Sequence, residues 1–236
     1  MPSLMPHTMT NRPSSRSRHP ASTGTATDPA AAARKVARTA AQEVRILGGQ
    51  WKRTPLPVPV SAGLRPTPSR VRETLFNWLG QDLSGWRVLD AFAGSGALGL
   101  EAASRGADEV CLLERDPALV RALQATQARL KAAQVQVQQA DALSWMAHPQ
   151  RAGRFDLVFL DPPFDADLFA PALAAAAHCV PAGGWLYLEA DRLFGDDDAA
   201  VRAAGLRVHR HGQAGAVHFH LFQRMADAAP ADGAVG

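Results

Sequence analysis

The sequence predicts an α/β fold in which a mostly parallel sheet is covered by helices on both faces. Short apolar runs alternate with helical patterns along most of the chain. These runs are nearly unbroken, as expected of strands that are buried on both faces. The chain has 236 residues, of which 47% are apolar and 20% charged, enough for one domain of ordinary size with tails.

Four segments differ in composition. Residues 1–43 are rich in Ser, Thr, Pro, Ala and Arg and nearly lack large apolar side chains. They are predicted to form a disordered basic extension, and a transit peptide is the alternative reading. Residues 44–80 predict an arm made of a hairpin and a helix, residues 81–225 the sheet domain, and residues 226–236 a mobile tail.

In the arm, VRILGGQWKRTPLPVPV reads as two short strands around a Gly-Gly turn. Its prolines confine the second strand to an edge. Ser69 is expected to cap a helix that ends at Gly80. Trp51 either stacks on a ligand or pins the hairpin to the body, and the second reading is favoured.

Seven strands are expected in the sheet domain. They are placed at Arg87–Asp90, Glu109–Glu114, Val135–Gln139, Phe155–Asp161, Trp185–Glu189, Leu206–His209 and Val217–Gln223. Helical patterns lie between the first five, near residues 97–105, 117–132, 142–147 and 167–179. The last two strands are joined by the short link GQAGA, which predicts an antiparallel hairpin at the edge of the sheet.

Charge is unevenly distributed along the chain. Residues 1–73 contain 12 basic and 3 acidic residues, whereas residues 74–236 contain 13 and 19. A basic arm on an acidic body suggests a polyanionic partner, although residues 1–40 could equally be a solvated tail.

Several classes of protein are excluded by composition. The two cysteines, Cys111 and Cys179, lie in apolar runs, and the Cys and His spacing fits no zinc site. Neither a disulfide scaffold nor a metal is therefore expected. No apolar stretch reaches the length of a membrane span, and no secretory signal is recognisable. A cytoplasmic protein is the expectation.

A glycine motif follows the first strand of the sheet domain. Gly94, Gly96 and Gly99 fit G-x-G-x-x-G, and Glu114 lies at the end of the next strand. This pattern predicts a tight turn against a ligand, with Glu114 accepting hydrogen bonds from ribose hydroxyls. NAD enzymes carry the same pattern, so a dinucleotide-dependent oxidoreductase is one hypothesis.

Asp90 favours S-adenosylmethionine over NAD. It ends the first strand four residues before Gly94, where a carboxylate would repel a pyrophosphate. The ammonium and sulfonium groups of S-adenosylmethionine would instead be attracted. Asp141, after the third strand, is placed to hold an adenine amino group. Helix capping is the alternative for Asp90 and Asp141, and simple solvation for Glu114.

The string FDLVFLDPPF carries the most specific signal. Asp161 ends the fourth strand at the same sheet edge as Asp90, and Pro162 and Pro163 prevent the loop from folding into a helical turn. The Asp161 carboxylate and the Pro162 carbonyl can accept hydrogen bonds from the two N–H groups of an exocyclic amine, while Phe164 stacks on the ring of the base. The alternative is a strand-to-helix turn in which Asp161 is an N-cap and Phe164 a core residue.

These motifs resemble the class I S-adenosylmethionine-dependent methyltransferases that methylate amino groups. RILGGQWKRTPLPVP, GLRPTPSRVRETLFNWL, LDAFAGSGALGLEAASRGA and FDLVFLDPPF, in this order, are similar to the RsmD-type enzymes. That family methylates N2 of guanine 966 in bacterial 16S ribosomal RNA. The resemblance spans roughly residues 44–224 and implies a Rossmann-like fold whose seven-stranded, mostly parallel sheet has an antiparallel last strand, with a small N-terminal hairpin and helix extension.

The resemblance also implies roles for individual residues. The cofactor S-adenosylmethionine would be bound by Asp90, Phe92, Gly94, Gly96, Glu114 and Asp141, with Arg65, Pro66 and Thr67 covering it. The target base would be held by the catalytic loop Asp161, Pro162, Pro163 and Phe164. The RNA phosphates would be contacted by Arg45, Lys52, Arg53, Arg65, Arg70 and Arg72.

The expected substrate is 16S ribosomal RNA in the small subunit or an assembly intermediate, and the expected enzyme is a monomer without metal or membrane. Two further hypotheses remain beside it. A DNA amino-methyltransferase would share the mechanism, but only about 40 ordered residues lie outside the sheet, too few for a target-recognition domain. A non-catalytic RNA-binding assembly factor would bind RNA but not the cofactor.

Overall fold

The computed structural model describes residues 44–58, 67–164 and 167–226. The predicted basic extension, Arg65, Pro66 and nearly all of the predicted tail lie outside these ranges. None of the described helices is long and apolar enough to cross a membrane.

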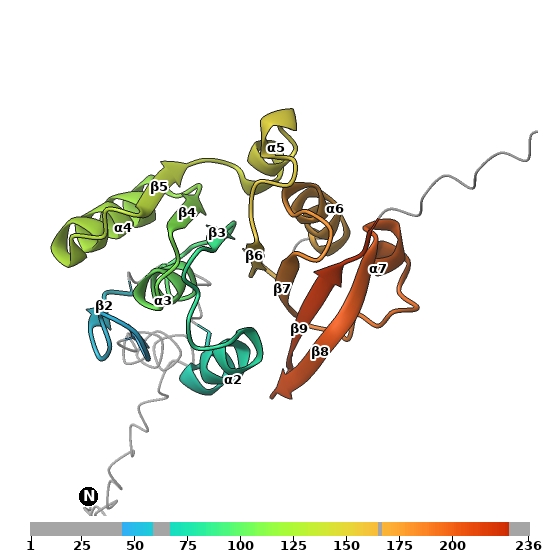
Figure 1. Ribbon diagram of the computed structural model, residues 1–236, viewed down its shortest axis with the longest axis horizontal. Helices are drawn as coiled ribbons and strands as arrows, with labels where there is room; N and C mark the ends of the chain where they lie inside the picture. The colour runs from blue at the N-terminus through green and yellow to red at the C-terminus, as the bar shows by residue number, and fades with distance from the viewer. Residues whose placement is uncertain (1–43, 59–66, 165–166, 227–236) are drawn as a thin grey trace, which may run out of the picture. The chain divides into compact units, whose positions relative to one another are not determined.

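A seven-stranded sheet forms the centre of the described chain (Figure 1). Its order is β5-β4-β3-β6-β7-β9-β8, and β9 is the strand that runs antiparallel to both of its neighbours. The strands are β3 (Arg87–Asp90), β4 (Glu109–Glu114), β5 (Val135–Gln139), β6 (Leu157–Leu160), β7 (Trp185–Ala190), β8 (Leu206–Ala214) and β9 (Val217–Arg224). The predicted mostly parallel sheet with its antiparallel last strand is thus confirmed.

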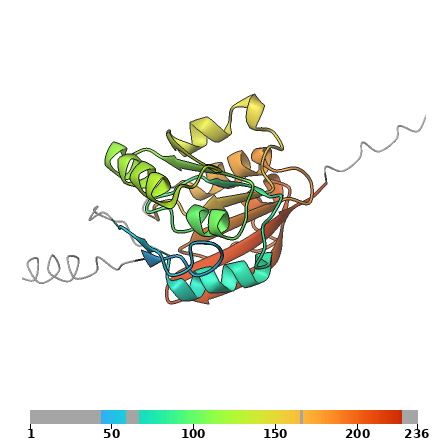
Figure 2. The same cartoon turned by 60° about the vertical axis from the view of Figure 1, so that its left-hand side comes forward.

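Helices cover both faces of this sheet (Figure 2). One face packs against α2 (Ser69–Leu79), α3 (Gly99–Ser104) and α4 (Pro117–Leu130), and the other against α5 (Ala142–Met146), α6 (Phe169–Cys179) and α7 (Ala199–Ala203). A short 3₁₀ helix, η1 (Pro149–Arg151), follows α5. The two apolar cores alternate along the buried strands because successive side chains point to opposite faces. In β6, for example, Phe159 belongs to the first core and Leu160 to the second.

The N-terminal arm forms the predicted hairpin, but its ladder is very short. The strands β1 (Val44–Arg45) and β2 (Pro55–Leu56) pair over two residues each. Helix α2 follows, although the predicted cap at Ser69 is wrong. Pro68 occupies the cap position and makes no side-chain capping hydrogen bond, so Ser69 is the first residue of the helix.

Two elements at the far edge differ from the sequence prediction. Strand β8 extends to Ala214, well beyond the predicted end at His209, and leaves only a tight turn before β9. A register shift between Val208 and Arg210 interrupts the apolar alternation there, which explains why the sequence pattern seemed to end. The short helix α7 was not predicted, because five residues capped by Asp198 are too few to show helical periodicity.

Candidate functional site

The carboxyl ends of β3 and β6 mark the place where the strand order reverses. From β3 the chain moves outward to β4 and β5, then returns to the other side of β3 for β6. The register sets Asp90 opposite Phe159, and the Ala91 N–H donates to the Phe159 carbonyl over 3.1 Å. Open α/β sheets bind ligands in the crevice at such a reversal. Both Asp90 and Asp161 lie there, as predicted.

The glycine turn after β3 is tied directly to Glu114. Gly94 and Gly96 have φ values of 51° and 77°, a conformation that favours glycine. A Cβ at Gly96 would also lie 2.8 Å from Leu123 Cδ2. The Glu114 carboxylate accepts the Gly94 N–H at 3.0 Å and the Asp116 N–H at 2.8 Å. Glu114 is therefore not merely solvated, and it lies against the turn that would approach a nucleoside.

Asp90 is buried beneath the same turn. It is 2% exposed, and its Oδ2 accepts the N–H of Gly99, the first residue of α3, at 2.9 Å. Burial raises the pKa of Asp90 to about 7; the Gly99 N–H opposes that rise, and the negative charge of Glu114 adds to it. A cation bound at this edge would favour the ionised carboxylate.

Asp141 lies at the same sheet edge, because Gln139 in β5 pairs with Glu114 in β4. Its side chain is exposed and accepts the Ser144 N–H at 2.9 Å, which caps α5. Asp141 is therefore observed to cap a helix, and its contact with an adenine amino group stays a prediction. Phe92, also expected at the cofactor, is half-buried against the core of the α5–α7 face.

Asp161 differs from the carboxylates of the glycine turn in having no hydrogen-bond donor. Its side chain is half-buried, and no described residue donates a hydrogen bond to it. Burial raises the pKa of Asp161 well above its usual value, and the charges of Glu189 and Asp90 raise it further. N–H groups that a ligand brings would favour the ionised form of Asp161, which can accept them.

The loop after Asp161 presents an aromatic ring at the surface. Pro162 is buried, Pro163 is exposed, and Phe164 is 39% exposed, with its ring centroid 6.1 Å from that of Phe169. Helix α6 begins only at Phe169. Asp161 thus caps no helix and Phe164 is not a core residue, so the alternative reading of the motif as a strand-to-helix turn does not apply.

A third carboxylate, not singled out in the sequence, lies at the end of β7. Glu189 is buried, accepts the Tyr187 hydroxyl at 2.9 Å, and is hydrogen-bonded by the side chain of Thr67. Burial raises the pKa of Glu189, while these two hydrogen bonds and the charge of Arg72 oppose the rise. Thr67, expected to cover the cofactor, is thus buried beside a carboxylate neighbouring Asp161. The sequence signal for Glu189 was that a glutamate ends the apolar run of the fifth predicted strand.

Four of the predicted RNA-contacting side chains are exposed, namely Arg45, Lys52, Arg53 and Arg70. Arg72 is the exception and corrects the prediction. It is 2% exposed and its Nη1 donates to the Arg45 carbonyl at 3.0 Å. A guanidinium so enclosed cannot reach a phosphate, because α2 turns this side chain toward the body.

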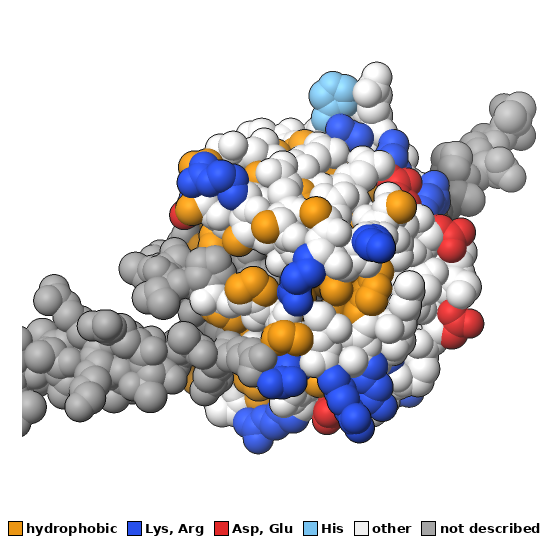
Figure 3. Space-filling model, turned by 90° about the vertical axis from the view of Figure 1, so that its left-hand side faces the viewer, with side chains coloured by type: hydrophobic (Ala, Val, Ile, Leu, Met, Phe, Trp, Pro, Cys, Tyr) orange, Lys and Arg blue, Asp and Glu red, His pale blue; other side chains and the backbone are white. Residues whose placement is uncertain are grey.

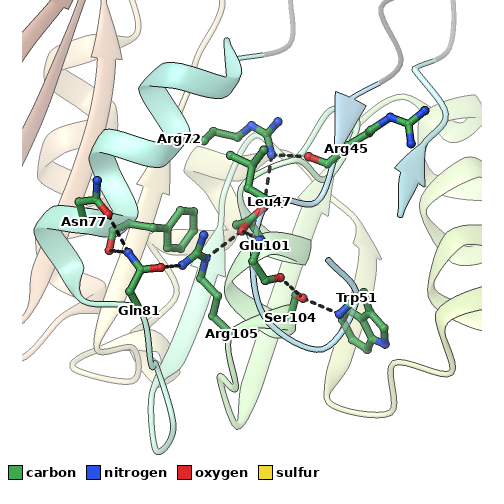
Figure 4. Close-up of polar contacts among 11 residues, drawn as sticks. Arg45, Leu47, Trp51, Arg72, Asn77, Gln81, Glu101, Ser104 and Arg105 are labelled. Atoms are coloured by element: carbon green, nitrogen blue, oxygen red, sulfur yellow. Dashed lines mark hydrogen bonds and ion pairs between the residues drawn. The ribbon is translucent and has the colours of Figure 1, made fainter. Parts of the chain in front are cut away.

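Arg72 instead belongs to a buried network centred on Glu101 (Figure 4). Glu101 Oε2 accepts the Leu47 N–H at 2.7 Å and Arg72 Nη1 at 3.4 Å. Its Oε1 accepts the Gly48 N–H at 2.8 Å and Arg105 Nε at 2.8 Å. One carboxylate in α3 therefore holds the hairpin, α2 and its own helix together.

The Gly-Gly turn of the hairpin lies directly on the end of α3. A Cβ at Gly49 would fall 1.7 Å from the Ser104 carbonyl oxygen, and one at Gly48 would fall 2.6 Å from the Arg105 guanidinium. Ser104 Oγ donates to the Gly48 carbonyl at 2.6 Å and accepts the Trp51 N–H at 2.9 Å (Figure 4). The indole of Trp51 packs against the core, which supports its favoured reading as a pin.

Comparison with known proteins identifies relatives over the described domain. The family model described as Conserved hypothetical protein 95 matches residues 44–223. Ribosomal RNA small subunit methyltransferase D of Escherichia coli K12 is 42% identical over 190 residues, covering 78% of this chain and 91% of its own. The protein of that name from Haemophilus influenzae is 37% identical over 185 residues, covering 77% and 94%.

A solved structure agrees with these matches. The methyltransferase yhhF of Escherichia coli superposes with a TM-score of 0.68 at 36% identity, covering 78% of this chain and 99% of that one. The two proteins therefore share one fold.

Proposed function

This chain belongs to the Conserved hypothetical protein 95 family and is of the RsmD type, and on that premise we propose that it transfers a methyl group from S-adenosylmethionine to N2 of a guanine in 16S ribosomal RNA. The observation that carries the proposal is the Asp161 carboxylate, which lies at the reversal of strand order and has no hydrogen-bond donor among the described residues.

The residues around the glycine turn fit the proposed cofactor. S-adenosylmethionine, when bound, supplies a methyl group on a cationic sulfonium. Asp90 and Glu114 offer negative charge to its cationic part and acceptors to its ribose, and no pyrophosphate has to be accommodated beside the buried Asp90. Asp141 would hold the adenine amino group while it caps α5.

The loop Asp161–Phe164 would prepare the amine for attack. The nitrogen lone pair of an exocyclic amine is delocalised into the ring, so the amine is a weak nucleophile. If the Asp161 carboxylate and the Pro162 carbonyl each accept one of its N–H groups, the lone pair is directed toward the methyl group. The methylated nitrogen is briefly cationic and acidic, so it loses a proton without a strong base. Exposed Phe164 can stack on the extruded ring.

Three alternative functions are less well supported. An oxidoreductase would place a pyrophosphate beside the buried carboxyl group of Asp90, whose ionised form would repel it. A DNA amino-methyltransferase would need a separate domain to read its target, and the described residues before the sheet domain, 44–58 and 67–80, form only a short hairpin and helix α2. An assembly factor without activity would have no use for the arrangement around Asp161.

The test is methyl transfer to small ribosomal subunits. Subunits are purified from a bacterial strain that lacks the activity and incubated with the protein and radiolabelled S-adenosylmethionine. We expect label in 16S ribosomal RNA and none in duplex DNA. Label in DNA alone would reverse the ranking, and tight RNA binding without label would favour the assembly factor. Calorimetric binding of NAD but not of S-adenosylhomocysteine would overturn every methylation reading.

A further inference from the structure

On one side of the molecule, a long stretch of the sequence contains basic residues and no acidic ones. Residues 117–140, which form α4, β5 and their link, contain no Asp or Glu. Arg121, Arg129 and Lys131 on this stretch are exposed. Figure 3 views this side and shows Lys and Arg side chains spread over it, with most acidic side chains toward the right-hand margin. Such a surface favours a polyanion.

This stretch is physically joined to the hairpin of the arm. Arg129 Nη2 donates to the Pro55 carbonyl in β2 at 2.7 Å. The hairpin itself, residues 44–58, is free of acidic residues and exposes Lys52 and Arg53. The two segments therefore form one continuous surface to which neither contributes an acidic side chain, here called the α4 surface, defined by Lys52, Arg53, Arg121, Arg129 and Lys131.

The opposite edge of the sheet provides a contrast. The exposed Arg202 and Arg207 lie there near acidic residues, because Asp191 and the run Asp196–Asp198 precede α7 and the Val208 N–H donates to Asp196 Oδ1 at 2.6 Å. Asp198 is ion-paired with Arg192 at 2.7 Å. Mixed charge of this kind is expected of an ordinary solvated surface. What distinguishes residues 117–140 from the stretch 199–226, which also lacks Asp and Glu, is the hydrogen bond from Arg129 to the hairpin of the arm.

We propose that the RNA backbone continues from the arm across the α4 surface, so that α4 is part of the substrate-binding surface. This inference rests on the proposed function. Helix α4 has 14 residues and is about 21 Å long, enough to accompany several successive phosphates. The side chains of Arg121 and Lys131 make no hydrogen bond or ion pair with the described residues, so their charges are available to a ligand. These contacts position the RNA and do not read its bases.

The test is the double variant R121E/K131E, compared with the matched control R202E/R207E. Both change the net charge equally, both alter exposed side chains, and each places one glutamate at the end of a helix. Initial rates of methyl transfer to small subunits and the salt dependence of RNA binding are measured. For R121E/K131E we expect KM to rise about tenfold with kcat retained. The plot of log affinity against log salt should become less steep, its slope decreasing in magnitude by about 2.

Each outcome supports or overturns the inference. The control is expected to leave KM within about twofold, because a change in net charge alone acts equally on both variants. Equal losses in the two variants would show a general charge effect and overturn the proposal, as would an unchanged KM in R121E/K131E. A loss of kcat, or of S-adenosylhomocysteine binding, would assign the effect to the cofactor site and also overturn it. If wild-type protein labels no RNA, the proposed function fails instead.

Discussion

The junction around Glu101 and the strand end around Asp161 differ in the partners that each provides for its carboxyl group, which is fully buried in Glu101 and half-buried in Asp161. Glu101 accepts four hydrogen bonds, two of them from guanidinium groups. Asp161 accepts none from the described residues, and its charged neighbours are the carboxylates Glu189 and Asp90. The first arrangement is complete without a ligand. The second becomes favourable only when a ligand brings N–H donors or positive charge, which is why function is assigned to it.

Removing the Asp161 carboxylate is expected to have the largest effect. Asp161→Ala is expected to lower the rate of methyl transfer about 10³-fold, because the amine loses its acceptor, while the affinity for S-adenosylhomocysteine changes little. Rates are measured with radiolabelled cofactor and affinity by calorimetry. Asp156→Ala is the control, since Asp156 lies before the other end of β6 and pairs with Arg87. Full activity in Asp161→Ala would remove the catalytic assignment.

The complementary change tests whether Glu101 is structural. Glu101→Gln leaves Arg72 and Arg105 buried without a negative partner and is expected to cost about 3 kcal/mol of unfolding free energy. Urea unfolding followed by circular dichroism measures it. Glu109→Gln breaks the partly exposed ion pair with Arg154, which should cost less than about 1 kcal/mol. Equal losses of unfolding free energy in the two variants would show that the buried Glu101 network contributes no more than a partly exposed ion pair.

Protonation of Asp90 should make ligand binding at the strand end around Asp161 depend on pH. Because its pKa is raised to about 7, Asp90 becomes neutral as the pH falls through that value. The affinity for S-adenosylhomocysteine, whose ammonium favours the carboxylate, should fall about tenfold between pH 8 and pH 6. Ligand-free protein should behave oppositely and lose stability as the pH rises from about 4 to 7, since the folded state then binds more protons than the unfolded state. Calorimetry with Asp90→Asn, which should show no such dependence of affinity, provides the control.

The smallest expected effect distinguishes capping from cofactor binding at Asp141. Asp141 and Asp198 cap α5 and α7 in similar ways, each accepting backbone N–H groups of its helix. Replacing either by Ala should cost about 1 kcal/mol of stability. Only Asp141→Ala should also weaken S-adenosylhomocysteine binding, by about fivefold. If calorimetry finds the same affinity in both variants, Asp141 is a cap and nothing more.

Much of the fold could be predicted because its strands are apolar and its turns carry glycine. The strands β3, β4 and β5 have their predicted bounds, since each is a short apolar or alternating run that ends in a polar residue. The end of β8 could not be predicted, because a register shift at Val208 and Arg210 breaks its alternation.

Residues of the candidate site could be predicted only where their sequence context is unusual. Asp161 precedes two prolines and Asp90 precedes a glycine turn, so both could be found in the sequence. Glu101 and Arg72 could not, because a charged residue in an amphipathic helix is normally exposed, and burial of this pair depends on contacts with the distant residues Leu47 and Gly48. Long-range pairing of this kind leaves no local pattern.

Mapping the methylated atom by mass spectrometry tests the central claim most directly. Ribosomal RNA labelled by the protein is digested to nucleosides, and the modified nucleoside is fragmented to locate the methyl group. An Asp161 carboxylate that grips an exocyclic amine predicts methylation at the amino nitrogen of guanine. A methyl group on a ring nitrogen, a carbon or a ribose hydroxyl would contradict the account, because none of those atoms offers two N–H bonds to Asp161 and Pro162.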